Sequence, residues 1–156
     1  MNNERPSGTS GSPGFEENRA DWQRVKAKLI RPSADLPLGP RGEAHAAKFL
    51  RQQGYRIIVR NRRHKKGEID LIAMNKEFLV FVEVRTRASE DFMTPEMSIR
   101  KDKRDMVRST ARRLIRKHKT AGLTPRIDVI AIIWPEGAKE PREVRHHKGV
   151  ISLAGW

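Results

Sequence analysis

Two acidic residues, Asp70 and Glu83, lie inside apolar runs at 67–72 and 81–85 that have the composition of β-strands. Burying a carboxylate without a cationic partner costs several kcal/mol, so a core strand rarely carries one for packing. Two such carboxylates indicate a shared divalent cation, Mg²⁺ or Mn²⁺, because these hard ions prefer oxygen ligands. Such an ion polarises a phosphate oxygen and activates water, which is the chemistry of phosphodiester hydrolysis.

The two segments predict adjacent strands of a hairpin, at 68–74 and 78–87. A four-residue loop at 75–78 would pair Asp70 with Glu83 and Glu68 with Arg85 on one face. Opposite Cβ atoms are about 5 Å apart, which lets both carboxylates reach one ion. A structural alternative stays open, in which Glu68 pairs with Arg85, Asp70 finds a backbone donor or a lysine, and Glu83 faces solvent.

Helices on either side of the hairpin are expected to add two more charged groups. Residues 42–53 predict a helix whose core-facing stripe includes Glu43. Residues 96–118 predict a longer helix, on which Lys103 shares a stripe with apolar residues and points inward. The alternative for Lys103 is a stem that lies on the core and an amine that stays in water.

The fold class predicted by these elements is α/β, a central mixed β-sheet flanked by helices in the order α-β-β-β-α-β. Further strands are expected at 55–61 and 127–134, with a basic loop at 62–67 and a possible last strand at 150–153. Residues 1–40 predict a flexible N-terminal extension, disordered at first and then helical at 18–30. The domain itself is expected to span residues 41–156.

Motif residues spread along this domain resemble those of a known bacterial family. They are Gly42-Glu43-Ala44, Phe49-Leu50, Gly54-Tyr55, Asn61, residues 67–72 and 81–87, Lys103, Ala111 and residues 126–129. The family is YraN, regarded as endonuclease-like, with a core similar to that of the PD-(D/E)XK nucleases, which include restriction enzymes and Holliday-junction resolvases. The resemblance implies a restriction-endonuclease-like core that acts on DNA, branched or structured DNA included.

Residue by residue, the resemblance implies that Asp70 and Glu83 are metal ligands and that Glu43 contributes from the first helix. Arg85 stands where the superfamily has a lysine, and Ile69 where its name has proline. Because arginine keeps its proton, Arg85 can position and stabilise groups but cannot act as a base. Lys103 could supply the lysine from the helix instead. The predicted catalytic residues are therefore Glu43, Asp70, Glu83, Arg85 and Lys103.

The charge of the chain indicates a polyanionic partner. It has 33 Lys and Arg against 19 Asp and Glu, a net charge of +14. Arginines recur every four residues from Arg100 to Arg116, with Asp102 and Asp105 as the acidic residues among them, so ion pairs cannot account for this ridge. A merely solvated helix face is the alternative. The predicted nucleic-acid contacts are Arg62, Arg63, Lys65, Lys66, Arg87, Arg100, Arg104, Arg108, Arg112 and Arg126.

Other classes of protein are disfavoured by what the sequence lacks. There is no cysteine, hence no disulfide and no cysteine-ligated metal. No membrane-length apolar run or secretory signal occurs, so a cytoplasmic protein without a membrane partner is expected. The three histidines at 64, 146 and 147 are expected at the surface, and Asp128 is either a third site acid or an ion-pair partner of Arg126.

Two functions follow from these observations. The first is a Mg²⁺- or Mn²⁺-dependent endonuclease acting on DNA, as a monomer or a homodimer. The second is a non-catalytic nucleic-acid-binding protein that keeps the nuclease fold, with turnover lost through Arg85. A weaker third hypothesis assigns a protein-interaction role to residues 15–30.

Overall fold

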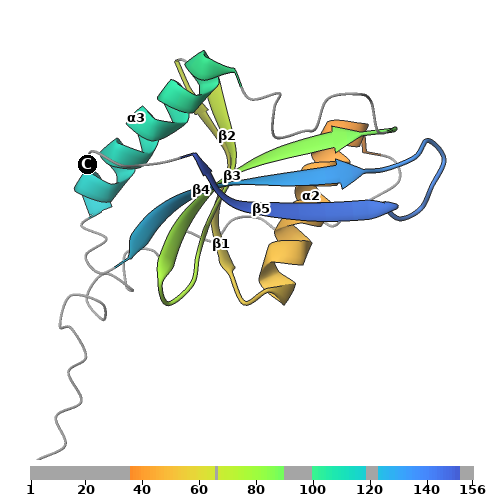
Figure 1. Ribbon diagram of the computed structural model, residues 1–156, viewed down its shortest axis with the longest axis horizontal. Helices are drawn as coiled ribbons and strands as arrows, with labels where there is room; N and C mark the ends of the chain where they lie inside the picture. The colour runs from red at the N-terminus through yellow and green to blue at the C-terminus, as the bar shows by residue number, and fades with distance from the viewer. Residues whose placement is uncertain (1–35, 66, 90–99, 119–122, 152–156) are drawn as a thin grey trace, which may run out of the picture.

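The chain folds into one mixed sheet with a helix on each face (Figure 1). The computed structural model describes residues 36–65, 67–89, 100–118 and 123–151. Its elements are α2 (Leu38–Gln52), β1 (Arg56–His64), β2 (Gly67–Met74), β3 (Phe78–Arg87), α3 (Lys101–His118), β4 (Thr124–Ile133) and β5 (Glu143–Ile151). The predicted α/β class and element order are confirmed, and a fifth strand is present, although it begins earlier than the possible last strand that was predicted.

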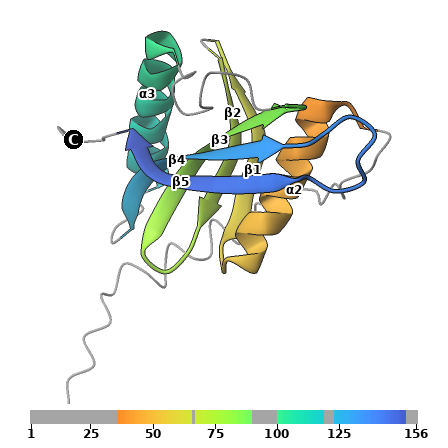
Figure 2. The ribbon, with the colours of Figure 1, turned by 45° about the vertical axis from the view of Figure 1, so that its right-hand side comes forward.

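The five strands lie side by side in the order β1-β2-β3-β4-β5. All neighbours are antiparallel except β3 and β4, which are parallel and are connected through α3. A parallel pair needs such a crossover, because its second strand must restart at the same end of the sheet. Figure 2 shows the result, with α3 on one face of the sheet and α2 on the other.

Apolar alternation along the strands builds a separate core layer under each helix. On β3, Leu79 and Phe81 belong to the layer that holds Met106 and Leu114 of α3. Val80 and Val82 belong instead to the layer that holds the buried face of α2. Since side chains alternate across a strand, the next odd-numbered residues of β3, at positions 83 and 85, continue the face toward α3.

Several predicted boundaries were wrong. Helix α2 begins at Leu38 rather than at residue 42, because Pro40 falls in its first turn, where no N–H is needed for a helical hydrogen bond. Strand β1 continues to His64, so the expected loop at 62–67 is mostly strand. Strand β4 begins before Pro125, at a strand start where proline is tolerated.

The ends of other predicted elements also need correction. The last strand is the basic segment Glu143–Ile151 rather than 150–153. Its backbone pairs with β4 even though most of its side chains are polar, so an apolar pattern did not mark it as a strand. The predicted helix at 18–30 and residues 96–99 of the long helix lie outside the described residues. Arg100 is described and is not helical, so α3 begins at Lys101, later than predicted. Among the helices that the structure describes, neither has the length and apolar character needed to cross a membrane.

Gly42 allows α2 to approach β3 closely. A Cβ atom at this position would clash with Thr86 Oγ1 and lie 2.9 Å from Thr86 Cβ. The absence of a side chain thus decides how near the start of α2 lies to β3. The next residue along the helix is Glu43, so this contact also sets the position of a predicted site residue.

Replacing Gly42 with alanine is expected to lower the free energy of unfolding by about 1–3 kcal/mol, the usual cost of overpacking. Gly39→Ala is the matched control, since it lies in the same helix with nothing within 4 Å of its added Cβ. Urea denaturation of both variants separates the clash from the better helix propensity of alanine. Equal stability of the two variants would contradict the close approach, and Thr86→Ala should partly rescue Gly42→Ala.

Candidate active site

The β2–β3 ladder ends just before the two buried carboxylates. Paired positions run from Met74–Leu79 to Leu71–Val82, which is the predicted register. The predicted direct pairs of Asp70 with Glu83 and of Glu68 with Arg85 are absent from this described ladder. Instead, Asp70 Oδ2 accepts a hydrogen bond of 2.7 Å from the Val84 N–H. The side chain takes a donor that would otherwise serve the ladder, and the strands diverge here into what we call the fork (Figure 1).

Glu83 lies at the base of the fork and contacts two cationic side chains. Lys103 Nζ is 2.7 Å from Oε2, and an Arg85 terminal nitrogen is 3.1 Å from Oε1. The Glu83 side chain is only 5% exposed, so it does not face solvent as the structural alternative required. Lys103 enters from α3 in the direction that its helix stripe predicted, with its amine on a buried carboxylate rather than in water.

The fold disfavours the charged form of Asp70. Burial, and then the nearby charge of Glu83, raise its pKa from 3.8 to about 7. The Val84 N–H and Lys103 act in the opposite direction, and Glu43 adds to the repulsion. Buried carboxylates that repel one another create the electrostatic environment that a bound cation relieves.

Glu43 reaches the same region from α2. Burial and the charge of Glu68 raise its pKa, while a side-chain hydrogen bond with Asn61 and the charge of Arg60 oppose that change. Asn61 has a left-handed backbone, with φ of 51°, and the β1–β2 pairing skips it. Asparagine tolerates this conformation better than most residues. Asn61 was not predicted as a site residue; an asparagine inside an otherwise strand-like run was the available signal.

The fork fits a divalent cation held by two carboxylates. Across the described ranges, no group of three or more His, Cys, Asp or Glu side chains is arranged to hold a metal. Mg²⁺ commonly takes one or two carboxylates and completes its shell with water and substrate phosphate, so Asp70 and Glu83 are the residues that would hold such an ion here. An entering cation would compete with Lys103 and Arg85 for the oxygens of Glu83.

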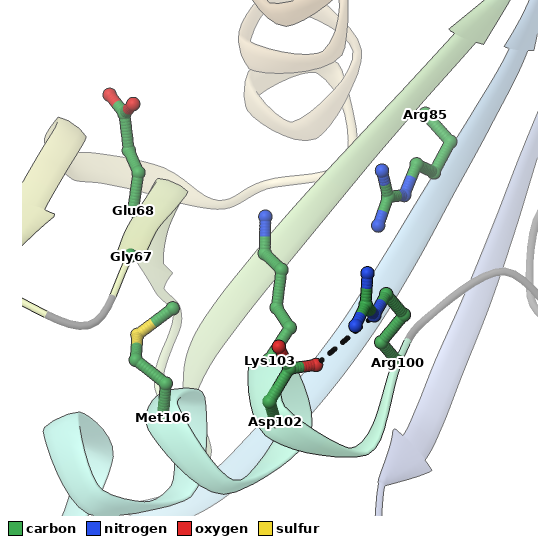
Figure 3. A pocket seen from close by; sticks show the side chains of 7 residues that line it. All are labelled: Gly67, Glu68, Arg85, Arg100, Asp102, Lys103 and Met106. Carbon is green, nitrogen blue, oxygen red and sulfur yellow. Dashed lines mark ion pairs between the residues drawn. The ribbon is translucent and has the colours of Figure 1, made fainter.

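A cleft of about 290 Å³ opens beside these groups, between the start of β2, the end of β3 and the start of α3 (Figure 3). Arg85 extends into it from β3 and Lys103 from α3, and Arg100 pairs with Asp102 at 3.6 Å. Three of its residues are cationic and two are acidic. The lining residues are Gly67, Glu68, Arg85, Arg100, Asp102, Lys103 and Met106.

Comparison with known proteins places this chain in a family. The family model described as "Uncharacterised protein family UPF0102" matches residues 42–132. The chain belongs to the UPF0102 family. A UPF0102 protein of Moorella thermoacetica is 45% identical over 113 residues, 72% of this chain and 93% of that protein. One of Rhodopirellula baltica is 35% identical over 120 residues, 76% of this chain and 72% of that protein.

The YraN resemblance is thereby confirmed, since UPF0102 is the same family. Its matched region begins at Gly42, the glycine that packs on β3, and ends inside β4. It therefore contains every residue of the fork. The names of these relatives state no activity, so the family match assigns no reaction.

Five of the ten predicted nucleic-acid contacts are exposed at the fork end of this UPF0102 domain. They come from the end of β1 and the turn that follows it, the end of β3 and the start of α3. They are Arg63, Lys65, Arg87, Arg100 and Arg104. Arg112 is exposed further along α3, and Arg108 is half-buried with Asp105 at 3.8 Å. Nothing is described of the Arg62 and Lys66 side chains.

Arg126 lies elsewhere and has a different role. Its β4 position pairs with Val80, toward the hairpin end of the sheet, and its side chain is 15% exposed. It donates to both oxygens of Asp128, at 2.8 and 2.9 Å, and to Tyr55 Oη at 2.8 Å. The predicted Arg126–Asp128 ion pair is thus confirmed, and Arg126 is not part of the exposed basic surface.

Asp128 joins β4 to β5. It contacts His146 Nε2 at 2.7 Å and accepts the Gly149 N–H at 2.9 Å. Burial alone would raise the pKa of Asp128, but hydrogen bonds from His146 and Arg126 hold it below its usual value. The prediction that His146 lies at the surface was wrong, because this contact leaves its side chain only 8% exposed. Asp128 is a structural acid.

Asp70→Asn is expected to stabilise the metal-free protein at about pH 8 by about 1–3 kcal/mol. Because the pKa of Asp70 is raised from 3.8 to about 7, the folded state loses stability as the pH rises through that interval. The variant keeps an acceptor for the Val84 N–H and lacks the charge. Urea denaturation in EDTA, below and above the pH range between 3.8 and about 7, measures the difference in free energy of unfolding between Asp70→Asn and the wild type. Asp102→Asn, at an exposed position, is the control. A loss of stability at about pH 8 would contradict the buried repulsion.

Asp128→Asn is expected to have the opposite effect, a loss of about 3 kcal/mol or more, because Arg126 and His146 would lose their buried acid. Since the pKa of Asp128 is lowered, its contribution is present above the unfolded value of 3.8 and is lost as the pH falls below it. Thermal unfolding of the variant between about pH 3 and 7 tests both points. Unchanged stability near neutral pH would show that the network is dispensable.

Proposed function

We propose that this UPF0102 protein is a Mg²⁺- or Mn²⁺-dependent endonuclease that hydrolyses phosphodiester bonds in DNA. The observation that carries the proposal is the fork, where buried Asp70 and Glu83 meet Lys103 and Arg85 beside a cationic cleft. Packing gives no reason to bury two repelling carboxylates at the open end of a sheet. Branched or structured DNA is the substrate that the family resemblance suggests.

The proposed roles follow from chemistry and position. Asp70 and Glu83 hold the cation, which when bound supplies Lewis-acid polarisation of the phosphate and lowers the pKa of a bound water. Arg85 stays protonated and stabilises the negative charge that develops on the phosphate. Lys103 presents from α3 the amine that a strand lysine presents in the PD-(D/E)XK superfamily. Glu43, oriented by Asn61, completes the acidic side of the fork.

The basic surface supports DNA as the substrate. Four acidic residues in this region, Glu43, Glu68, Asp70 and Glu83, act on one another through their charges and by themselves would repel a polyanion. Exposed cations at the same end of the sheet offset this repulsion, among them Arg63, Arg87 and Arg104. Contacts of this kind bind backbone phosphates without reading sequence, and their strength falls steeply with salt.

A second candidate is a nucleic-acid-binding protein that keeps this fold without turnover. One observation favours it: Lys103 and Arg85 of the same chain both form ion pairs with Glu83. An acid that is satisfied by its own chain has less need of a divalent cation. The two candidates share the basic surface and differ only in whether Asp70 and Glu83 serve catalysis.

A cleavage assay separates the two candidates. Supercoiled and branched DNA would be incubated with Mg²⁺ or Mn²⁺ and either the wild type or the variants Asp70→Asn, Glu83→Gln and Lys103→Met. Loss of a ligand should abolish cleavage, and loss of Lys103 should slow it about 100-fold or more. Lys101→Met is the matched control, since it removes an exposed lysine from the same helical turn.

Metal binding has a readout of its own. Mg²⁺ should raise the melting temperature of the wild type, because a ligand that binds only the folded state stabilises it, and should leave Asp70→Asn unchanged. Identical, metal-independent behaviour of wild type and variants in both assays would overturn the nuclease proposal. Salt-sensitive DNA binding in that case would favour the non-catalytic candidate.

A further inference from the structure

Two arginines on the α2 side of the sheet lie close together without an acidic partner. On α2, Glu43, Ala47 and Arg51 are spaced four residues apart and so lie along one line of the helix. Arg60 of β1 pairs with Leu71, whose side chain belongs to the core layer under α2. The charge of Arg60 acts on both Glu43 and Arg51, so its side chain lies near this line of α2.

The guanidinium of Arg60 is poorly satisfied within the chain. Its Nε and Nη1 atoms are buried without a hydrogen-bond partner, and no ion pair within 4 Å joins Arg51 or Arg60 to any residue in the described part of the chain. Glu43, the nearest acid along the line, is engaged by Asn61. Both arginines are only half-exposed, so water compensates them incompletely.

Electrostatics point in the same direction. Burial lowers the pKa of both arginines. The charge of Arg60 lowers that of Arg51 further, and the charge of Glu43 offsets only part of the effect on Arg60. Two partly desolvated like charges held together destabilise the free protein, and an anion between them would remove that cost. Guanidinium groups match phosphate oxygens in bidentate geometry, which makes a phosphate the anion that this pair fits best.

We infer that Arg51 and Arg60 bind a backbone phosphate of the nucleic acid on the α2 side of the sheet, the face opposite the α3 ridge. This inference rests on the proposed function for its partner. Arg60 adjoins Asn61, which contacts Glu43 at the fork, so the phosphate lies next to the reactive site in the fold. The nucleic acid would then contact both faces of the sheet, through Arg51 and Arg60 on one face and through the cations of α3 on the other, with the fork between these two sites.

The test measures DNA binding by Arg51→Gln, Arg60→Gln and the double variant. Glutamine keeps much of the arginine stem and removes the charge. Lys76→Gln is the control, because it removes an exposed cation from the β2–β3 turn at the far end of the sheet. Arg104→Gln probes the α3 ridge independently. Fluorescence anisotropy with labelled duplex and single strands of about 20 nucleotides, in EDTA at several salt concentrations, gives affinities without cleavage.

Each single variant should weaken binding about 5- to 10-fold, and the double variant should reduce the slope of log affinity against log salt by about 1. The melting temperature of the double variant should stay the same or rise, because a repulsive pair is removed. A merely structural pair would instead lose stability. Lys76→Gln should bind as the wild type does.

Three results would overturn the inference. If Arg104→Gln weakens binding while the Arg51 and Arg60 variants bind normally, the α2 site fails and the proposed function stands. If the wild type shows no salt-dependent DNA binding, both fail together. If inorganic phosphate raises the melting temperature of the wild type but not of the double variant, while DNA affinity is the same for both, the pair binds free phosphate rather than a nucleic-acid backbone.

Discussion

The mutual repulsion of Asp70 and Glu83, buried together at the open end of a hairpin, is the constraint on which this site depends. The ladder stops there because Asp70 takes the Val84 N–H. Counter-charge then has to come from elsewhere, and it comes from Arg85 on the same strand and Lys103 on the crossover helix. The crossover helix is therefore both a cover for the core and the carrier of a charge that the fork requires.

Two of the buried acids, Asp128 and Asp70, show how surroundings decide the role of a carboxylate. Asp128 is fully buried, yet Arg126, His146 and a backbone N–H satisfy it, and its pKa falls. Asp70 is slightly less buried, has one backbone donor and a carboxylate neighbour, and its pKa rises. The first stabilises the fold, whereas the second stores unfavourable energy at a site open to ligands.

Local patterns predicted much of this arrangement, and the remainder depends on contacts distant in sequence. Strand alternation and a short loop specified the β2–β3 register, and helical spacing directed Glu43 and Lys103 inward. A backbone donor for Asp70 was one of the alternatives left open, and the Val84 N–H confirms it. The divergence of the strands was not predicted, because it arises where that side chain replaces a backbone acceptor. Nor was the left-handed Asn61 or the burial of His146, since each depends on a partner from another element. Secondary-structure ends were least predictable, because sheet pairing extended β1 and β5 through polar residues.

Gly42 and Glu43 form a unit in which one position supplies space and the next supplies charge. Without a side chain at 42, α2 settles against Thr86, and the following residue is carried toward the fork. A larger residue at 42 would move α2 away from Thr86, and the Glu43 carboxylate away from the fork, even if Glu43 were kept. With an apolar residue at 43, the close approach of α2 to β3 would bring no charge to the fork. Substitutions at positions 42 and 43 therefore depend on each other. The effect of a change at one position is set by the residue that occupies the other.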